Sequence, residues 1–152
     1  MKKFRFRLQA ILEHRERREA IAKQTFAEAQ TALTQAEQLL DEMREVRQAI
    51  LDELCRRPVG VFDPFETQIY QDYMQVITRS IADQENYVRE LLTSCEAQKQ
   101  HLIGTSQDRK ALDTMRDRHK LEHTLGVQRD EQSAMDELNT TRFNYNQHHQ
   151  GG

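Results

Sequence analysis

Apolar residues recur at alternating spacings of four and three along the first third of the chain. A mean spacing of 3.5 residues keeps one stripe of a helix against a partner helix while the two supercoil, so the pattern predicts a coiled-coil seam of about seven heptads. The apolar seam positions are Leu8, Leu12, Ala22, Phe26, Ala29, Leu33, Ala36, Leu40, Met43, Ile50 and Leu54, and the exceptions are Arg15, Glu19 and Arg47.

A turn should follow this seam, because both prolines of the chain and one glycine fall between residues 57 and 64. Asp63 suits the N-cap of a second helix, Pro64 suits its first position, and Glu66 stands three residues after the cap. The sequence therefore predicts helix one over about residues 5–56, a turn over about 57–63 and helix two from residue 64.

The second helix carries its own seam in the same spacing: Tyr70, Met74, Ile77, Ile81, Gln84, Val88, Leu91, Cys95, Gln98, Leu102, Thr105, Arg109 and Leu112. Folding back at residue 62, inside the predicted turn, pairs residues whose numbers sum to 124, such as Leu33 with Leu91 and Leu12 with Leu112. Two layers fit poorly, Ala29 facing Cys95 and Arg15 facing Arg109. We predict an all-α fold in one domain over residues 1–152, a long antiparallel two-stranded coiled-coil hairpin with arms of about 75 Å.

Beyond about Arg116 the second helix has no partner left in the first. Apolar residues still recur at helical spacing, so we expect an overhanging C-terminal helix to about residue 141 and a disordered tail over 144–152. A lone helix is marginal in water, so its apolar face should either fray or serve a partner. The residues of this face are Leu121, Leu125, Met135 and Leu138.

Composition argues against an enzyme with a thick core, because 31% of residues are charged, 7% are aromatic and Trp is absent. A net charge of -3 gives no reason to expect a nucleic acid partner, although residues 1–18 hold seven bases against two acids. A basic start before heptads also occurs in DNA-binding zippers, but here the heptads find their partner in the same chain and Phe4 and Phe6 interrupt the bases.

The sequence also predicts where the protein is located and whether its cysteines are paired. No apolar run approaches the roughly 20 residues that cross a bilayer, and the start lacks the apolar region of a secretory signal. Cys55 and Cys95 would lie far apart along the hairpin, so we expect two free thiols in a reducing cytoplasm.

One motif matches a metal site by pattern alone. The stretch from His119 to His123 fits H-x-x-E-H, but zinc also needs a third protein ligand in a preformed pocket, and only 29 residues follow, all of them predicted helix or tail. We therefore interpret these histidines as solvated helix-surface residues and expect no cofactor.

Apolar residues off the seam point to protein contacts, because a two-stranded coil leaves them exposed. They fall in overlapping stretches of the predicted hairpin, and Tyr is enriched at interfaces. They are Leu39 and Val46 on helix one, and Ile69, Tyr73, Val76 and Tyr87 on helix two.

Three stretches resemble the FliJ family, the stalk-like component of the flagellar type III export apparatus. The first runs from Lys3 to Leu12 (KFRFRLQAIL) with Arg15 after it. The second is Tyr70-Gln71-Asp72-Tyr73 through Ile77 and Ile81, and the third runs from Arg109-Lys110-Ala111-Leu112 on to Met135-Asp136-Glu137-Leu138.

The resemblance implies a non-enzymatic cytoplasmic stalk at the inner-membrane face of the flagellar base. Such a stalk would sit in the hexameric export ATPase, promote its assembly or activity, and touch the cytoplasmic domain of the export gate. The implied ATPase contacts are Phe4, Arg5, Arg7, Leu8, Met135, Leu138 and Arg142, within an overhanging stretch from Met135 to Phe143. The implied gate contacts are Leu39, Met43, Val46, Ile50, Tyr73, Ile77, Ser80 and Gln84, several of which lie on the predicted seam.

Other readings stay open at this point. A generic cytoplasmic coiled-coil tether would show the same seam, and the stalk of a virulence secretion system is a close structural relative. The sequence also leaves open whether the chain escorts export chaperones, and whether it is a monomer or a swapped dimer.

Overall fold

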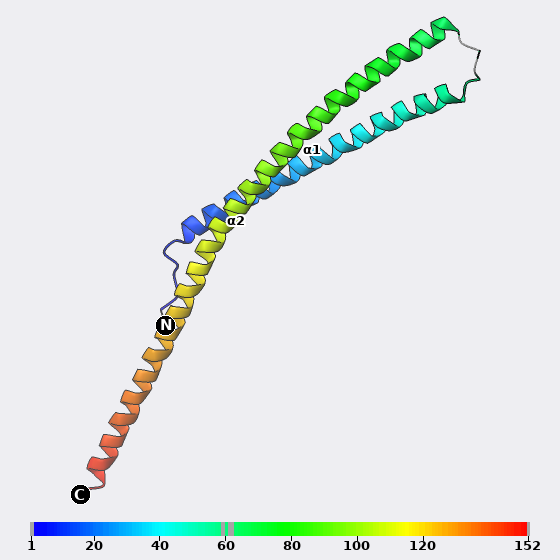
Figure 1. The fold of residues 1–152 in the computed structure, drawn as a ribbon. Helices are drawn as coiled ribbons and strands as arrows, with labels where there is room; N and C mark the ends of the chain where they lie inside the picture. The colour runs from blue at the N-terminus through cyan, green and yellow to red at the C-terminus, as the bar shows by residue number, and fades with distance from the viewer. Residues whose placement is uncertain (1, 59, 61–62, 152) are drawn as a thin grey trace. The chain divides into compact units, whose positions relative to one another are not determined.

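Two long α-helices make up nearly all of the chain. The computed structural model describes residues 2–58, 60 and 63–151, with α1 over Gln9–Arg56 and α2 over Pro64–His149 (Figure 1). No β-strand occurs among these residues. The all-α class predicted from the heptads is confirmed, while Val59, Val61 and Phe62 of the predicted turn lie outside the described residues.

The chain divides into two compact units, each with residues from both helices. The turn unit is Glu19–Thr105, and the terminal unit consists of Met1–Arg18 and Ser106–Gly152. We predicted one domain over residues 1–152. Both helices run through the boundaries without a break, so no linker segment separates the units.

In the turn unit the predicted seam forms the core. Every seam position from residue 19 to 54 and from 70 to 105 is buried or half-buried. One cluster joins Ala36, Leu40, Ile81 and Val88, with Leu33, Met43, Ile77 and Leu91 packed against it. The cluster contains both members of the predicted pairs 36 with 88, 33 with 91 and 43 with 81, so the antiparallel register is confirmed here.

Polar side chains join the two helices of the turn unit at the edge of this core. Gln84 donates its Nε2 hydrogen to the carbonyl oxygen of Ala36 at 3.0 Å. Arg44 and Glu85 form an ion pair with 3.1 Å between Nη2 and Oε1. A seam glutamine is therefore tolerated because its amide has a partner on the opposite helix.

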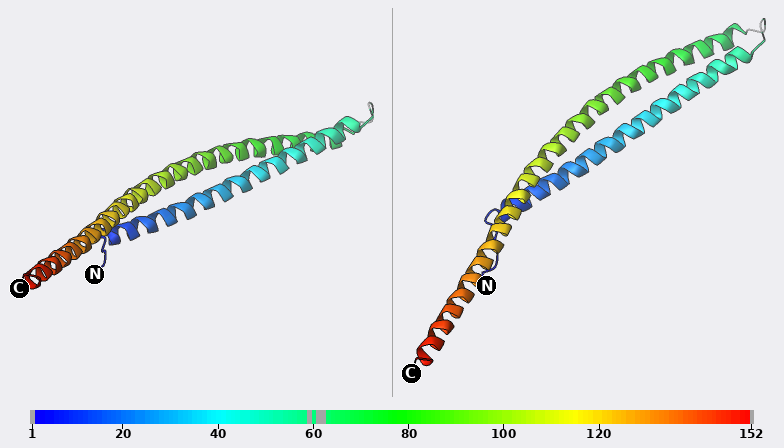
Figure 2. Two further views of the ribbon diagram at one scale, coloured as in Figure 1. Left: turned by 90° about the horizontal axis from the view of Figure 1, so that it is seen from below. Right: turned by 60° about the horizontal axis from the view of Figure 1, so that its bottom comes forward.

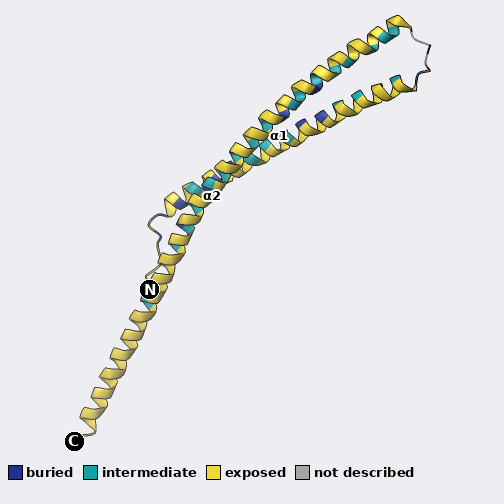
Figure 3. Cartoon of the chain, in the orientation of Figure 1, coloured by how far each residue is buried: buried dark blue, intermediate teal, exposed yellow. Residues whose placement is uncertain are grey.

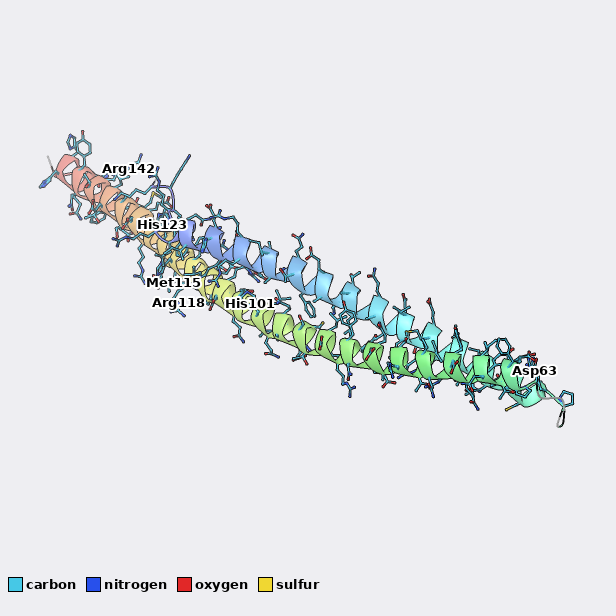
Figure 4. The ribbon with its side chains drawn as sticks, turned by 90° about the horizontal axis from the view of Figure 1, so that it is seen from above. Asp63, His101, Met115, Arg118, His123 and Arg142 are labelled. Atoms are coloured by element: carbon cyan, nitrogen blue, oxygen red, sulfur yellow. The ribbon has the colours of Figure 1, made fainter. Side chains whose placement is uncertain are left out.

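The start of α2 is capped as predicted. The carboxylate of Asp63 accepts a hydrogen bond from the amide of Phe65 at 3.0 Å, and Pro64 is the first helical residue (Figure 4). Before the cap, Gly60 has a φ of 110°, a conformation that glycine adopts without the strain of a side chain.

Glu66 pairs across the ends of the two helices. Its Oε1 lies 2.7 Å from Nη2 of Arg57, whose guanidinium also donates to the Tyr70 hydroxyl at 2.9 Å. The hydrogen bond with Glu66 raises the pKa of Arg57 and lowers the pKa of Glu66. The sequence predicts Glu66 only as a residue three positions after the N-cap, so its ion pair with Arg57 was not predicted.

The terminal unit has a smaller core. Phe6, Leu12 and Leu112 are buried, with Phe4 and Leu8 packed against them, and Leu12 has no exposed surface. The predicted pair of Leu12 with Leu112 is therefore present. The poor layer of Arg15 and Arg109 is relieved, because Arg15 donates to the carbonyl oxygen of Asp108 at 2.8 Å and Arg109 pairs with Asp113.

The first helix begins later than predicted, at Gln9 rather than near residue 5. The reason is that Phe4 and Phe6 both contact α2, and a helix would turn residues two apart to nearly opposite sides. An irregular, extended segment places both rings on one side. The segment ends where the amide of Gln9 donates to the carbonyl oxygen of Phe6 at 3.1 Å.

The second helix ends later than predicted, at His149, so the prediction of a disordered tail over 144–152 was wrong for residues 144–149. This stretch has no proline and no glycine before Gly151, so nothing interrupts the backbone hydrogen bonds. The rings of Tyr145 and His149, one turn apart, stack at 4.2 Å between centroids. All residues from 128 to 151 are exposed, and Figures 2 and 3 show the end of α2 beyond the N-terminal segment without another segment beside it.

Candidate partner-binding surfaces

The predicted ATPase contacts at the start of the chain divide into a packed and an exposed set. Phe4 and Leu8 are half-buried against the core of the terminal unit, whereas the side chains of Arg5 and Arg7 are exposed. Phe4 and Leu8 therefore hold the segment in place, and Arg5 and Arg7 are the residues available to a partner.

A shallow basic hollow surrounds this segment. Its lining combines Phe4, Arg5, Phe6 and Gln9 with Arg116, Asp117 and Lys120 of α2. Arg116 is held by ion pairs of 3.3 Å to Asp113 and Asp117. The uncompensated positive charge of the hollow is thus contributed by Arg5 and Lys120, and anionic side chains of a partner would be attracted to it.

His119 and His123 have a packing role that the sequence did not predict. The ring of Phe4 lies 5.7 Å from that of His123 in a tilted arrangement, and the ring of Phe6 lies 6.0 Å from that of His119 in an edge-on arrangement, both measured between ring centroids. Histidines four residues apart lie on one side of a helix, which matches aromatic residues two apart in an extended segment. The interpretation of these histidines as solvated residues is wrong for His123, which is half-buried, whereas His119 is exposed.

The other predicted ATPase contacts lie together on the free arm of α2. Met135 and Leu138 are 59% and 65% exposed, and with Asn139, Thr141, Arg142 and Tyr145 they line one shallow surface. This surface offers a partner an apolar stripe with one guanidinium. It is distinct from the Phe4 segment, because about 18 Å of helix separates residue 123 from residue 135.

The predicted gate contacts also divide into two sets. Met43, Ile77 and Gln84 are engaged in the core of the turn unit, and Ser80 is half-buried. Leu39, Val46 and Tyr73 are 48%, 43% and 46% exposed. The exposed set, rather than the seam set, is available to a partner.

Three of the predicted gate residues meet in one groove between the helices of the turn unit. The groove has a volume of about 630 Å³ and is lined by Val46, Ala49, Ile50, Glu53, Ile69, Tyr70 and Tyr73. Ala49 and Glu53 were missed as surface residues, since neither is a large apolar side chain. Each stands one position before a seam residue, as Val46, Ile69 and Tyr73 do, and that spacing was the available signal.

The site chemistry is that of binding surfaces. Across residues 2–58, 60 and 63–151, no group of three or more His, Cys, Asp or Glu side chains is arranged to hold a metal ion. Within the same residues, no helix is long and apolar enough to span a bilayer. Cys55 and Cys95 are free, as predicted.

An antiparallel pair of long helices places the chain among all-α helical hairpin proteins. Residues 4–148 of the chain match the family described as Flagellar FliJ protein, and the chain belongs to this family. It is thereby a structural component of the flagellar protein export apparatus. Comparisons with curated proteins and with solved structures gave no match.

Proposed function

We propose that this chain is the stalk that links the flagellar export ATPase to the export gate. The terminal unit engages the hexameric ATPase, and the turn unit engages the cytoplasmic domain of the gate. The protein acts at the cytoplasmic face of the inner membrane, where it is held by these partners. The proposal is supported by one observation: the exposed residues suited to binding a partner fall into two sets, one in each unit.

The ATPase-binding set is formed by the basic segment around Arg5 and Arg7 and by the free arm around Met135 and Leu138. The arm has no partner within its unit, yet it keeps large apolar side chains exposed over several turns. An isolated helix gains little from such residues, so a protein partner that covers them explains their presence.

The gate-binding set is the groove around Val46 and Tyr73 together with Leu39. Aromatic and branched apolar residues at half exposure are typical of interface cores, and Tyr in particular carries large contact area with few rotatable bonds.

In this proposal, binding of the chain favours some conformations of the ATPase subunits over others. The terminal unit lacks the symmetry of the ring, so it makes different contacts with each subunit, stabilises some subunit conformations over others and shifts nucleotide turnover. Because coupling between two binding sites is reciprocal, engagement of the gate changes the affinity of the chain for the ring by the same factor as the ring changes its affinity for the gate. The chain itself needs no nucleotide site for this role.

Arg5→Glu combined with Arg7→Glu is expected to abolish stimulation of the export ATPase of the same organism. Both side chains are exposed, so the change inverts the charge offered to the ring without removing a core contact. The measurement is the steady-state rate of ATP hydrolysis at several concentrations of each variant.

A matched control is Arg79→Glu combined with Lys99→Glu, which makes the same charge change at exposed positions of the turn unit. This control should stimulate like the wild type. Equal stimulation by the Arg5 and Arg7 variant would reject the basic segment as an ATPase contact.

A further inference from the structure

The two sides of the turn-unit seam differ in chemistry. We call the positions one before a seam residue, within 39–53 and 69–87, the apolar flank: Leu39, Glu42, Val46, Ala49 and Glu53 on α1, and Ile69, Tyr73, Val76, Ser80, Asp83 and Tyr87 on α2. Positions one after a seam residue, within 41–55 and 71–89, form the polar flank: Asp41, Arg44, Gln48, Leu51 and Cys55 on α1, and Gln71, Gln75, Thr78, Ala82, Glu85 and Arg89 on α2.

Contacts bring members of each flank together across the two helices. The Arg44–Glu85 ion pair closes the polar flank across the helices. On the other side, Val46 and Ala49 line the same groove as Ile69 and Tyr73. A two-stranded coil normally carries charged residues on both flanks, so the apolar flank is the unusual one.

The apolar flank has the spacing of a second seam. On α2 its positions run 69, 73, 76, 80, 83 and 87, the same alternation of four and three, with Ser80 and Asp83 as polar members. Its large residues stay exposed, from 43% for Val46 to 63% for Val76. A helix with two adjacent seams is built to contact two other helices, because each seam packs one partner.

Charge identifies what kind of helix fits there. Residues 39–56 and 64–87 contain nine acids, Asp41, Glu42, Glu45, Asp52, Glu53, Glu66, Asp72, Asp83 and Glu85, against four bases, Arg44, Arg47, Arg56 and Arg79. Among them, Glu53 lines the groove itself and Glu42, Asp72 and Asp83 are exposed on the same helices. A second copy would bring the same acidic face against this one, and like charges at an interface disfavour that pairing.

We propose that the apolar flank accepts one amphipathic helix with Lys or Arg beside its apolar stripe, which completes a three-stranded coil in the turn unit. The inference rests on the proposed function for the location of a partner surface, and adds the shape and charge of the partner segment. From residue 69 to residue 87 the flank is about 27 Å long, so the docked helix has about five turns.

The test uses two synthetic helical peptides of about 20 residues, with Leu and Ile in 3.5-residue spacing. One has Lys at the flanking positions and the other has Glu, and binding of the full chain is followed by fluorescence anisotropy. The Lys peptide should bind at least about tenfold more tightly, and its affinity should fall as salt rises. Val46→Ser with Tyr73→Ser should weaken it about tenfold or more, whereas Leu51→Ser with Gln75→Ser on the polar flank should not.

Three results would overturn the inference. They are no binding of either peptide, equal binding of both, or equal binding of the Lys peptide to both double variants. The Lys–Glu comparison requires no variant, so a folding defect cannot mask it. Because no gate protein is present, failure here is distinct from failure of the wild-type chain to bind the gate.

Discussion

Ile81→Asp should strongly destabilise the turn unit. Ile81 is 2% exposed at the centre of the core cluster, and an unpaired aspartate there loses its hydration as well as the apolar contacts. We expect a loss of more than about 3 kcal/mol in the free energy of unfolding and a melting temperature lower by about 10 °C. The measurement is thermal unfolding followed by circular dichroism at 222 nm.

Val76→Asp is the matched control, because it makes a similar change five residues earlier on the same helix at a position that is 63% exposed. It should melt within a few degrees of the wild type. If the Ile81 variant melted alongside it, residue 81 would not be part of the seam and the register would be in error.

Phe6→Ala should release the N-terminal segment from α2. Phe6 is 8% exposed, packs with Leu12 and Leu112, and contacts the ring of His119. Truncation of a buried Phe costs about 3–5 kcal/mol of folding free energy in a well-packed core. Here we expect the change to weaken the packing of residues 2–8 against α2. We expect hydrogen exchange to accelerate at the first turn of α1, and the ring signals of His119 and His123 to move toward those of free histidine.

Phe143→Ala provides the comparison, since Phe143 is 62% exposed on the free arm. It removes the same side chain and should leave both observables unchanged. Histidine signals that stay in place in the Phe6 variant would show that the segment does not depend on this ring.

Spacing alone predicted the central architecture because a coiled coil is a repeating contact. Leu33, Ala36 and Leu40 repeat at the heptad period, and each finds its partner at the position fixed by the turn. The N-cap at Asp63 was also predicted from the sequence, because capping depends on residues next to each other in the chain.

The parts that were not predicted depend on contacts outside the repeat. Phe4 and Phe6 were read as an interruption of a basic stretch, but their two-residue spacing matches histidines one turn apart on α2. The pairing of Arg57 with Glu66 depends on where the helix ends meet. The tail was predicted to be disordered, whereas continuous backbone hydrogen bonds extend the helix to His149.

The candidate surfaces were predicted only in part. Val46 and Tyr73 were found because large apolar residues off a seam stand out in the sequence, and both line the groove. Met43 and Ile77 were assigned to the gate by family resemblance, and both pack half-buried against the core cluster, so their assignment to the gate stays a prediction.

The central claim is that two separate surfaces serve two partners, and a pull-down with both partners tests it most directly. The wild-type chain, Met135→Glu with Leu138→Glu, and Val46→Ser with Tyr73→Ser are each presented to the export ATPase and to the cytoplasmic domain of the gate. We expect the first double variant to lose the ATPase and keep the gate, and the second to lose the gate and keep the ATPase. Failure of the wild-type chain to bind both partners, or retention of both by each variant, would contradict the account.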